Sequence, residues 1–167
     1  MCSSDLPHVA LAAPTGKAAA RMREALREAV DPKQKSPLQV DAETRAAILE
    51  LPAETLHRLL GVRPDGSCRH DERNPLAADL VIVDEVSMVD LTLMRRLAEA
   101  VRPEARLVLL GDRDQLASVE AGSVLADLVQ AADSDPALGA HRCAFTTSRR
   151  FRSAPDVGLV AACLQSY

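Results

Sequence analysis

The stretch Leu80-Val81-Ile82-Val83-Asp84-Glu85 decides how this chain of 167 residues folds. An uninterrupted apolar run of this length is typical of a strand in a parallel sheet whose two faces are both covered. Two acidic residues end the run, and α/β proteins bind ligands beyond the carboxyl ends of their parallel strands. The stretch therefore predicts a buried strand that delivers a pair of carboxylates to a ligand-binding edge.

Strand and helix patterns alternate on both sides of this strand. Further strands are expected at residues 8–13, at residues 106–110 (a second buried strand) and at residues 145–147. Helices are expected at residues 17–30, 40–49, 55–60, 90–101 and 123–132, with a closing helix behind a cap at Asp156. Polar loops are expected at residues 31–37, 62–75 and 133–143. This alternation predicts an α/β fold, a three-layer parallel sheet with crossover helices.

The amino-acid composition limits the classes of protein to which the chain can belong. Hydrophobic residues make up 47% of the chain and charged residues 26%, which excludes a mostly disordered protein. Aromatic residues make up only 2%, so the core must be aliphatic. A net charge of −4 argues against a generally basic nucleic-acid coat and leaves room for a local groove. No apolar run approaches the roughly 20 residues of a membrane-spanning helix.

The cysteines favour a reduced, cytoplasmic compartment, because none stands in a Cys-x-x-Cys pair. An alternative is a zinc site, which Cys68, His70, His141 and Cys143 could form if their two loops met. Their spacing differs from that of known zinc fingers, so scattered thiols and surface histidines are the preferred interpretation. Residues 1–7 fit none of the patterns and are interpreted as a non-native scar or a disordered end.

The acidic pair and a neighbouring glutamine suit a magnesium nucleotide. Asp84 would hold Mg²⁺ through its water shell, and Glu85 would orient and polarise an attacking water. Gln115, just past the strand at residues 106–110, could reach a terminal phosphate. The alternative interpretations are a solvated acidic turn after the first strand and a polar Gly-Asp turn after the second.

A phosphate-binding loop of the form Gly-x-x-x-x-Gly-Lys-Ser/Thr does not fit the single Gly-Lys pair, Gly16-Lys17. The first glycine of that loop would fall at Leu11, and its hydroxyl residue would fall at Ala18. Residues 14–17 are therefore not interpreted as a phosphate loop.

Together these segments resemble the RecD family, the alpha subunits of exodeoxyribonuclease V, which are superfamily 1 helicases that move 5′ to 3′ along single-stranded DNA. The segments that carry the resemblance are residues 12–21, 55–61, 83–90, 111–122 and 148–151, in that order. The resemblance extends over residues 9–162, and the string at 111–122 is its most specific part.

The resemblance implies a role for each matching position. Pro14, Thr15 and Lys17 match helicase motif Ia, and Thr55 and His57 match a second element that contacts the DNA strand. Asp84 and Glu85 match the Walker B pair, Gln115 the phosphate sensor of motif III, and Arg150 the arginine of motif IV. The neighbouring Arg149 is an alternative for that last assignment. Structural interpretations also stay open: Lys17 as the first basic residue of a helix, His57 as a capped or half-buried histidine, and residues 149–152 as a solvated basic face.

The resemblance further implies a RecA-like P-loop NTPase domain that is incomplete here. Residues 8–167 would form part of helicase motor domain 1A, from motif Ia to motif IV. The phosphate-loop strand would precede this chain and the second motor domain would follow it, so the chain by itself is expected to be inactive.

The implied parent is an ATP-dependent 5′–3′ DNA helicase subunit of a RecBCD-type helicase/nuclease in double-strand break repair and recombination. ATP and Mg²⁺ would be its cofactors, and single-stranded DNA with RecB- and RecC-like subunits its partners. The alternatives are a stand-alone RecD-like helicase, a conjugative relaxase-type helicase, and a non-enzymatic DNA-binding remnant.

Overall fold

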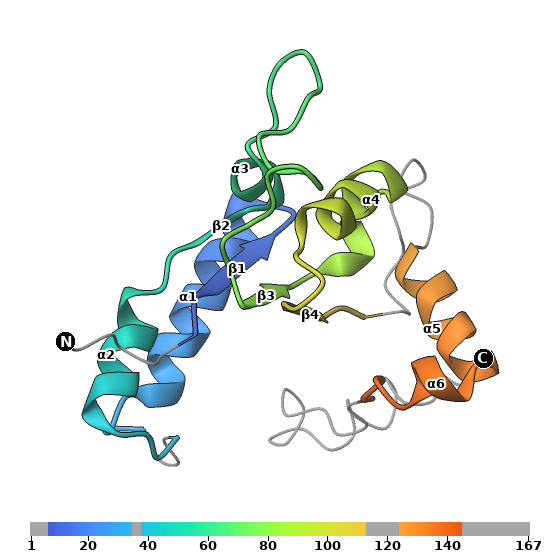
Figure 1. The fold of residues 1–167 in the computed structure, drawn as a ribbon. Helices are drawn as coiled ribbons and strands as arrows, with labels where there is room; N and C mark the ends of the chain where they lie inside the picture. Colours follow the sequence, from blue (N-terminus) through green and yellow to red (C-terminus); the bar gives the residue numbers. More distant parts are fainter. Residues whose placement is uncertain (1–6, 35–37, 113–123, 145–167) are drawn as a thin grey trace.

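A computed structural model describes residues 7–34, 38–112 and 124–144 of the chain. Its centre is a four-stranded sheet in the order β2-β1-β3-β4, in which all three pairings are parallel (Figure 1). The strands are β1 (Val9–Ala13), β2 (Ala53–Thr55), β3 (Leu80–Val83) and β4 (Arg106–Leu109). The predicted parallel α/β sheet is therefore confirmed. The strand expected at residues 145–147 and the helix expected after Asp156 lie outside the described residues.

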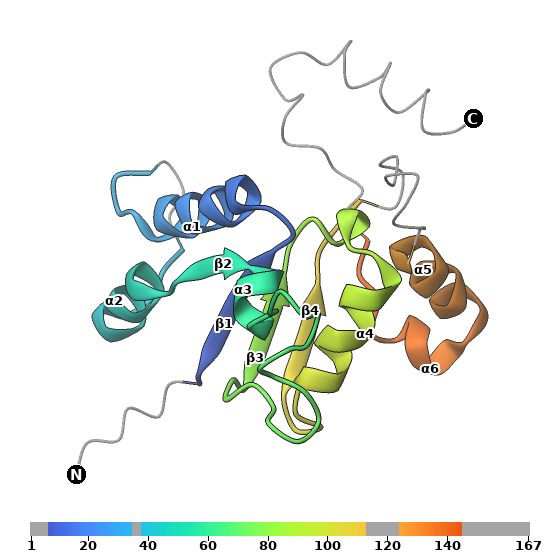
Figure 2. The same cartoon turned by 90° about the horizontal axis from the view of Figure 1, so that it is seen from above.

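Helices connect the strands in chain order (Figure 2). They are α1 (Gly16–Val30) and α2 (Ala42–Glu50) before β2, α3 (Leu56–Leu60) after it, the short 3-10 helix η1 (Val86–Met88) and α4 (Leu91–Ala100) after β3, and α5 (Val124–Ser134) with α6 (Pro136–Gly139) after β4. Side chains on a strand alternate between the two faces of its sheet. On β1, Ala12 packs with residues of α3 and α4, whereas Ala13 packs with Ala18 and Ala19 of α1. The two clusters confirm three layers, with α1 on one face and α3 and α4 on the other.

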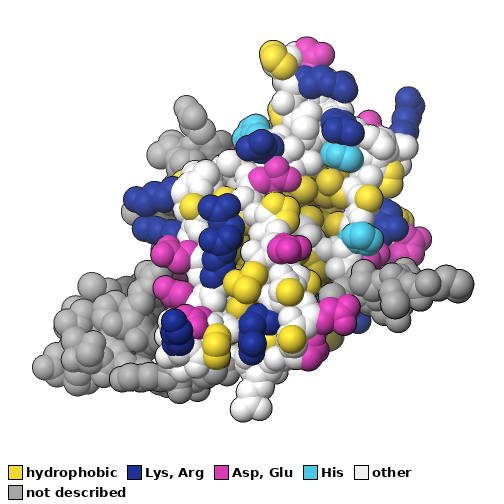
Figure 3. Space-filling view, turned by 90° about the vertical axis from the view of Figure 1, so that its left-hand side faces the viewer, with side chains coloured by type: hydrophobic (Ala, Val, Ile, Leu, Met, Phe, Trp, Pro, Cys, Tyr) yellow, Lys and Arg dark blue, Asp and Glu magenta, His cyan; other side chains and the backbone are white. Residues whose placement is uncertain are grey.

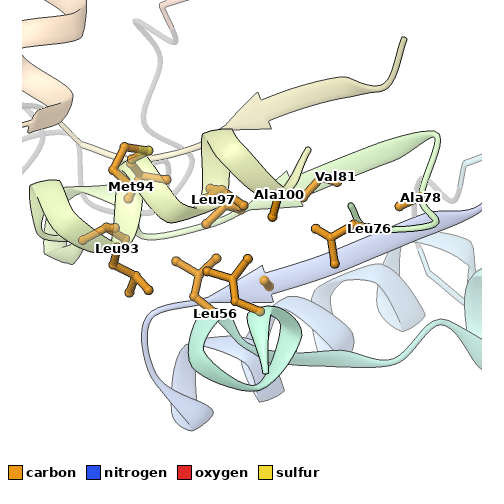
Figure 4. Close-up of a cluster of buried hydrophobic side chains, with 13 residues drawn as sticks. Leu56, Leu76, Ala78, Val81, Leu93, Met94, Leu97 and Ala100 are labelled. Carbon is orange, nitrogen blue, oxygen red and sulfur yellow. The ribbon is translucent and has the colours of Figure 1, made fainter. Parts of the chain in front are cut away.

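The main core lies between the sheet and the helices α3 and α4. Figure 4 shows its side chains, among them Leu56 of α3 and Leu97 of α4, which are both 0% exposed. The buried members of this cluster are Ala, Val, Leu and Met residues: Ala12, Leu56, Leu60, Leu76, Ala78, Val81, Val83, Val86, Val89, Leu93, Met94, Leu97 and Ala100. The expected aliphatic core is confirmed, and its apolar burial is the main stabilising contribution to the fold.

The expected burial of two strands is wrong. On β3, Val81 and Val83 are buried but Leu80 and Ile82 are only half-buried. On β4, Val108 is 37% exposed, and the strand alternates between exposed and half-buried residues. The reason is position: β4 pairs with β3 on one side and forms the outer strand of the described sheet. Helix α4 covers only one face of these strands.

Several helix and strand boundaries also differ from expectation. Strand β2 was not expected, because Ala-Glu-Thr carries little β preference and is recruited by pairing with β1. Helix α2 begins at Ala42 because Asp41 caps it, and its Oδ1 accepts a hydrogen bond from Thr44 N at 2.7 Å. Helix α6 occupies part of the loop expected at residues 133–143.

A group of polar contacts around Asp79, called here the latch, connects the starts of β1 and β3 with the turn before β4. The carboxylate of Asp79 accepts a hydrogen bond from the backbone N–H of His8 at 2.8 Å and another from Arg102 at 2.7 Å. Arg102 also donates to the carbonyl oxygen of Ala78 at 3.0 Å. The hydrogen bond from His8 and the nearby charge of Arg102 hold the pKa of Asp79 below its ordinary value. Among the described residues, no helix is both long and apolar enough to cross a membrane.

Candidate functional site

The candidate site is the edge of the sheet where the four parallel strands end, called here the carboxyl edge. Residues 14–17 follow β1, Thr55 ends β2, residues 84–85 follow β3, and residues 110–112 follow β4. The register aligns Ala13 with Thr55 and Ala12 with Val83, so the ends of these strands lie side by side. The structure thus brings together seven of the residues predicted from the sequence: Pro14, Thr15, Lys17, Thr55, His57, Asp84 and Glu85.

The direction of the chain across the sheet reverses at this edge. From β1 the chain crosses over α1 to β2 on one side, and then crosses over α3 to β3 on the other side of β1. Such a reversal places the two crossover helices on opposite faces, and α/β proteins bind ligands beyond the strand ends at this point. Here the reversal lies between β1 and β3.

Several hydrogen bonds fix the backbone that carries Asp84 and Glu85 at the carboxyl edge. Asp84 N donates to Ala12 O at 3.0 Å, and Asp84 Oδ1 accepts from Glu85 N at 2.8 Å. Glu85 O accepts from Met88 N at 3.1 Å, which starts η1. Glu85 has a φ of 53° and a ψ of 39°, the left-handed region that a non-glycine residue adopts only at a cost. This left-handed residue is the turn through which the chain passes from β3 into η1.

One cation on α1 approaches the Glu85 carboxylate. Arg21 Nη1 lies 3.9 Å from Glu85 Oε1, and the two side chains are 65% and 31% exposed. The sequence interpretation gave Arg21 no role. Its spacing was the available signal, because it stands four residues after Lys17 and therefore on the same face of α1.

The residues that follow β1 and β2 form two helix starts at the carboxyl edge. Thr15 Oγ1 accepts a hydrogen bond from Ala18 N at 3.2 Å, and Thr55 Oγ1 accepts one from Arg58 N at 3.3 Å. Each hydroxyl therefore acts as a helix cap and still has its own hydrogen to donate to a ligand oxygen. The bond from Ala18 N also shows that Thr15 caps α1. In a phosphate loop, backbone amides at this place would instead face the phosphates.

Lys17 and His57 stand beside these caps with exposed side chains. The exposure of His57 removes the interpretation of a half-buried structural histidine. Figure 3 shows one face of the molecule, where Lys and Arg side chains are interspersed with Asp and Glu side chains. Contact with a polyanion on this face would therefore be local, in agreement with the net charge of −4.

The donor set at Asp84 and Glu85 fits Mg²⁺. This ion keeps several waters and binds through one or two carboxylates together with phosphate oxygens, so it needs no dedicated cluster of ligands. Within the described residues, Asp84 Oδ2 has no hydrogen-bond partner and remains available to a metal-bound water. Residues 7–34, 38–112 and 124–144 contain no group of three or more His, Cys, Asp or Glu that could hold a metal ion. The four residues weighed for zinc, Cys68, His70, His141 and Cys143, all fall within these ranges.

Two predicted site residues are not placed. Gln115 and Arg150 lie outside the described residues, as does Arg149. The turn that leads toward Gln115 is described as far as Asp112, and its first part packs closely. A Cβ on Gly111 would lie 2.7 Å from Leu125 Cδ2 and 3.3 Å from Val86 N. The turn after β4 thus passes close to the backbone of η1, and a larger residue at 111 would have to displace the Leu125 side chain.

The parallel sheet and the acidic end of β3 define an α/β protein of the RecA-like, nucleotide-binding type. A family profile described as "AAA domain" matches residues 2–121, and the chain belongs to this family.

Within the family the chain is RecD-like, as its motifs indicated. It is 56% identical over 146 residues to the RecBCD enzyme subunit RecD of Mycobacterium tuberculosis H37Rv, covering 87% of this chain and 24% of that protein. It is 51% identical over 163 residues to the RecBCD enzyme subunit RecD of Mycolicibacterium smegmatis, covering 96% of this chain and 27% of the relative. The ATP-dependent RecD2 DNA helicase of Deinococcus radiodurans is 45% identical over 124 residues, which cover 74% of this chain and 14% of that helicase. The chain thus spans about a quarter of the length of these RecD relatives.

Proposed function

We propose that this chain forms part of the first motor domain of an ATP-dependent 5′–3′ DNA helicase that serves as a RecBCD-type subunit in double-strand break repair and recombination. The observation that carries the proposal is the carboxyl edge itself. There the acidic pair Asp84-Glu85 follows β3, and Thr15 and Lys17 at the start of α1 follow the neighbouring strand β1. The similarity to RecD over most of the chain supports it.

The acidic pair would prepare the hydrolysis of ATP. When bound, MgATP supplies the phosphoryl group whose transfer to water releases the energy for movement. Asp84 would hold a water of the Mg²⁺ shell with its available oxygen. Glu85 would orient and polarise the attacking water, and no covalent bond to the protein is needed. We further propose that Gln115 senses the terminal phosphate and that Arg150 stabilises its charge, on the strength of the family resemblance.

The two capped helix starts would hold the DNA strand. The hydroxyls of Thr15 and Thr55 each have a hydrogen to donate to a phosphate oxygen, and Lys17 and His57 add exposed donors beside them. Contacts of this kind fix the register of the strand and do not read its sequence. As two motor domains close on ATP and reopen after hydrolysis, these contacts would move along the strand.

RecB- and RecC-like subunits are the proposed partners, and the cytoplasm is the proposed compartment. The proposal of a subunit follows the relatives named as the RecBCD enzyme subunit RecD, two of which are 56% and 51% identical to this chain. Identity alone does not separate the subunit from the stand-alone helicase, because the RecD2 helicase at 45% falls within the range of 30% to 56% that the RecD-named relatives span. Co-purification with RecB- and RecC-like proteins supports the subunit; a complete protein that unwinds DNA without partners supports the stand-alone form.

The proposed chemistry is tested by Glu85→Gln in the complete protein that contains this chain. Because the amide cannot polarise the water, ATP turnover should fall at least ~100-fold while ATP still binds. Fluorescent-nucleotide binding and phosphate release measure the two effects separately. Glu104→Gln, an identical chemical change at an exposed turn before β4, is the matched control and should leave both unchanged. Turnover near the wild-type rate in Glu85→Gln would contradict the assignment.

A further inference from the structure

Arg21 connects the start of α1 with the acidic pair at the end of β3. It lies on α1, the helix that begins with Thr15 and Lys17, and its guanidinium lies 3.9 Å from the carboxylate of Glu85. Lys17 and Arg21 are four residues apart, so their side chains emerge one above the other on the same face of the helix. A phosphate held at Lys17 would therefore come within reach of the next basic group, Arg21.

The backbone of Glu85 is held by hydrogen bonds, so its carboxylate can change direction only by rotation of the side chain. Its backbone N–H donates to Asp84 Oδ1 at 2.8 Å, and its carbonyl oxygen accepts from Met88 N at 3.1 Å. The next residue is fixed as well, since Val86 N donates to Leu110 O at 3.0 Å. Rotation about the side-chain bonds is thus what decides where the Glu85 carboxylate points, and Arg21 is the partner that draws it toward α1.

The ion pair between Arg21 and Glu85 is weak enough for Arg21 to exchange Glu85 for another partner. At 3.9 Å it is longer than a charge-assisted hydrogen bond, and the Arg21 side chain is 65% exposed. Exposed pairs of this kind are weak because water screens them. A phosphate offers Arg a stronger, two-pronged partner, because the planar guanidinium matches its oxygens. Arg21 can therefore leave Glu85 when a strand phosphate arrives.

We propose that Arg21 is a positioning residue that holds the Glu85 carboxylate toward α1 until a phosphate of the DNA strand, bound beside Lys17, takes its guanidinium. Released from Arg21, the Glu85 side chain turns to the attacking water. DNA contact at the start of α1 is in this way coupled to hydrolysis at the end of β3. The inference rests on the proposed function and assigns a residue that connects its two sites.

Arg21→Ala in the complete protein tests the coupling. Without the cation, Glu85 is free before DNA binds, so ATP turnover without DNA should rise roughly fivefold or more. Turnover at saturating single-stranded DNA should stay within roughly twofold of wild type, so the stimulation by DNA shrinks. Arg23→Ala removes the same charge from an exposed position of α1 and should retain the wild-type stimulation. Equal melting temperatures of the two variants establish that both are folded.

Two results would overturn the proposal. One is a wild-type ratio of stimulation in Arg21→Ala; the other is an equal fall of turnover with and without DNA, which marks a purely structural or direct catalytic role. The double variant Arg21→Ala/Glu85→Gln adds a test of the route. Its turnover should stay as low as that of Glu85→Gln, and a rise would show that Arg21 does not act through Glu85. Failure of the proposed function is distinct, because Glu85→Gln alone would then remain active.

Discussion

At the scale of single residues, Glu85 carries the greatest local strain. Among the described residues it is the one non-glycine residue with a positive φ, 53°. Backbone strain of this kind persists where the surrounding structure enforces it, and it gathers at functional sites. Hydrogen bonds from Glu85 N and to Glu85 O enforce it here. The strain and the proposed catalytic role thus fall on the same residue.

The strain gives a prediction about stability. Glycine adopts the left-handed conformation without a steric cost, whereas alanine pays the same cost as glutamate. Glu85→Gly should therefore be more stable than Glu85→Ala by about 1 kcal/mol, while both lose ATP turnover. Urea denaturation of the two variants measures the difference. Equal stabilities, or a less stable glycine variant, would show that the conformation at residue 85 is not strained.

Sequence reasoning reached Asp84 and Glu85 because their signal is local: an apolar run that ends in acids. Thr15 and Thr55 were assigned only through the resemblance to the RecD family, and their place at the same edge was not predicted, because β2, which ends at Thr55, was not expected. Arg21 could not be assigned in this way, since its partner is distant in the chain and the contact depends on how α1 packs beside β3. The positive φ of Glu85 is equally invisible in the sequence, because glutamate has no preference for that conformation.

At the scale of elements, hydrophobic periodicity predicted β1, β3, β4 and the longer helices, but it missed β2 and α6 and did not predict the burial of each strand. The helix expected at residues 90–101 is α4, and its Leu93, Leu97 and Ala100 are all buried. Strand β4 has an equally apolar sequence, yet Val108 is 37% exposed. An apolar run indicates that a strand is suited to burial. The position of that strand in the sheet decides how much of its surface is covered.

The latch at Asp79 connects β1, β3 and the turn before β4, and it predicts a pH dependence. The pKa of Asp79 is lowered in the folded state, chiefly by the hydrogen bond from His8 N–H and then by Arg102. A carboxyl group with a depressed folded pKa stabilises the fold above its unfolded pKa of about 4, and this stability is lost as the pH falls through the folded value. Asp79→Asn should therefore lower the melting temperature at pH 7, and the gap to wild type should close below about pH 4.

Thermal melts of both proteins between pH 7 and pH 3 measure this gap. Glu104→Gln, which removes a carboxylate from an exposed turn, is the control and should track the wild type at every pH. A gap that stays constant with pH would mean that the Asp79 carboxylate contributes nothing through its charge.

At the scale of the whole molecule, the proposed motor needs a phosphate loop, and the residues of this chain do not match the pattern of one. The chain spans about a quarter of its RecD relatives, and its Gly16-Lys17 pair lacks the surroundings of a phosphate loop. Thr15 instead caps α1. The 167-residue chain on its own should therefore release no phosphate from ATP, with or without single-stranded DNA. DNA-stimulated turnover by this chain alone would contradict the incomplete motor domain.

The central claim is that the carboxyl edge binds a DNA strand and couples this binding to ATP hydrolysis. The most direct measurement is ATP turnover by the complete protein as single-stranded DNA is titrated, for the wild type and for Lys17→Ala. DNA should stimulate turnover, and Lys17→Ala should require roughly threefold or more DNA for half of the effect, because one phosphate contact is lost. Lys33→Ala, at an exposed lysine beyond the end of α1, should follow the wild type. The claim would be contradicted if ATP turnover did not change with added DNA, or if the titration curves of Lys17→Ala and the wild type were identical.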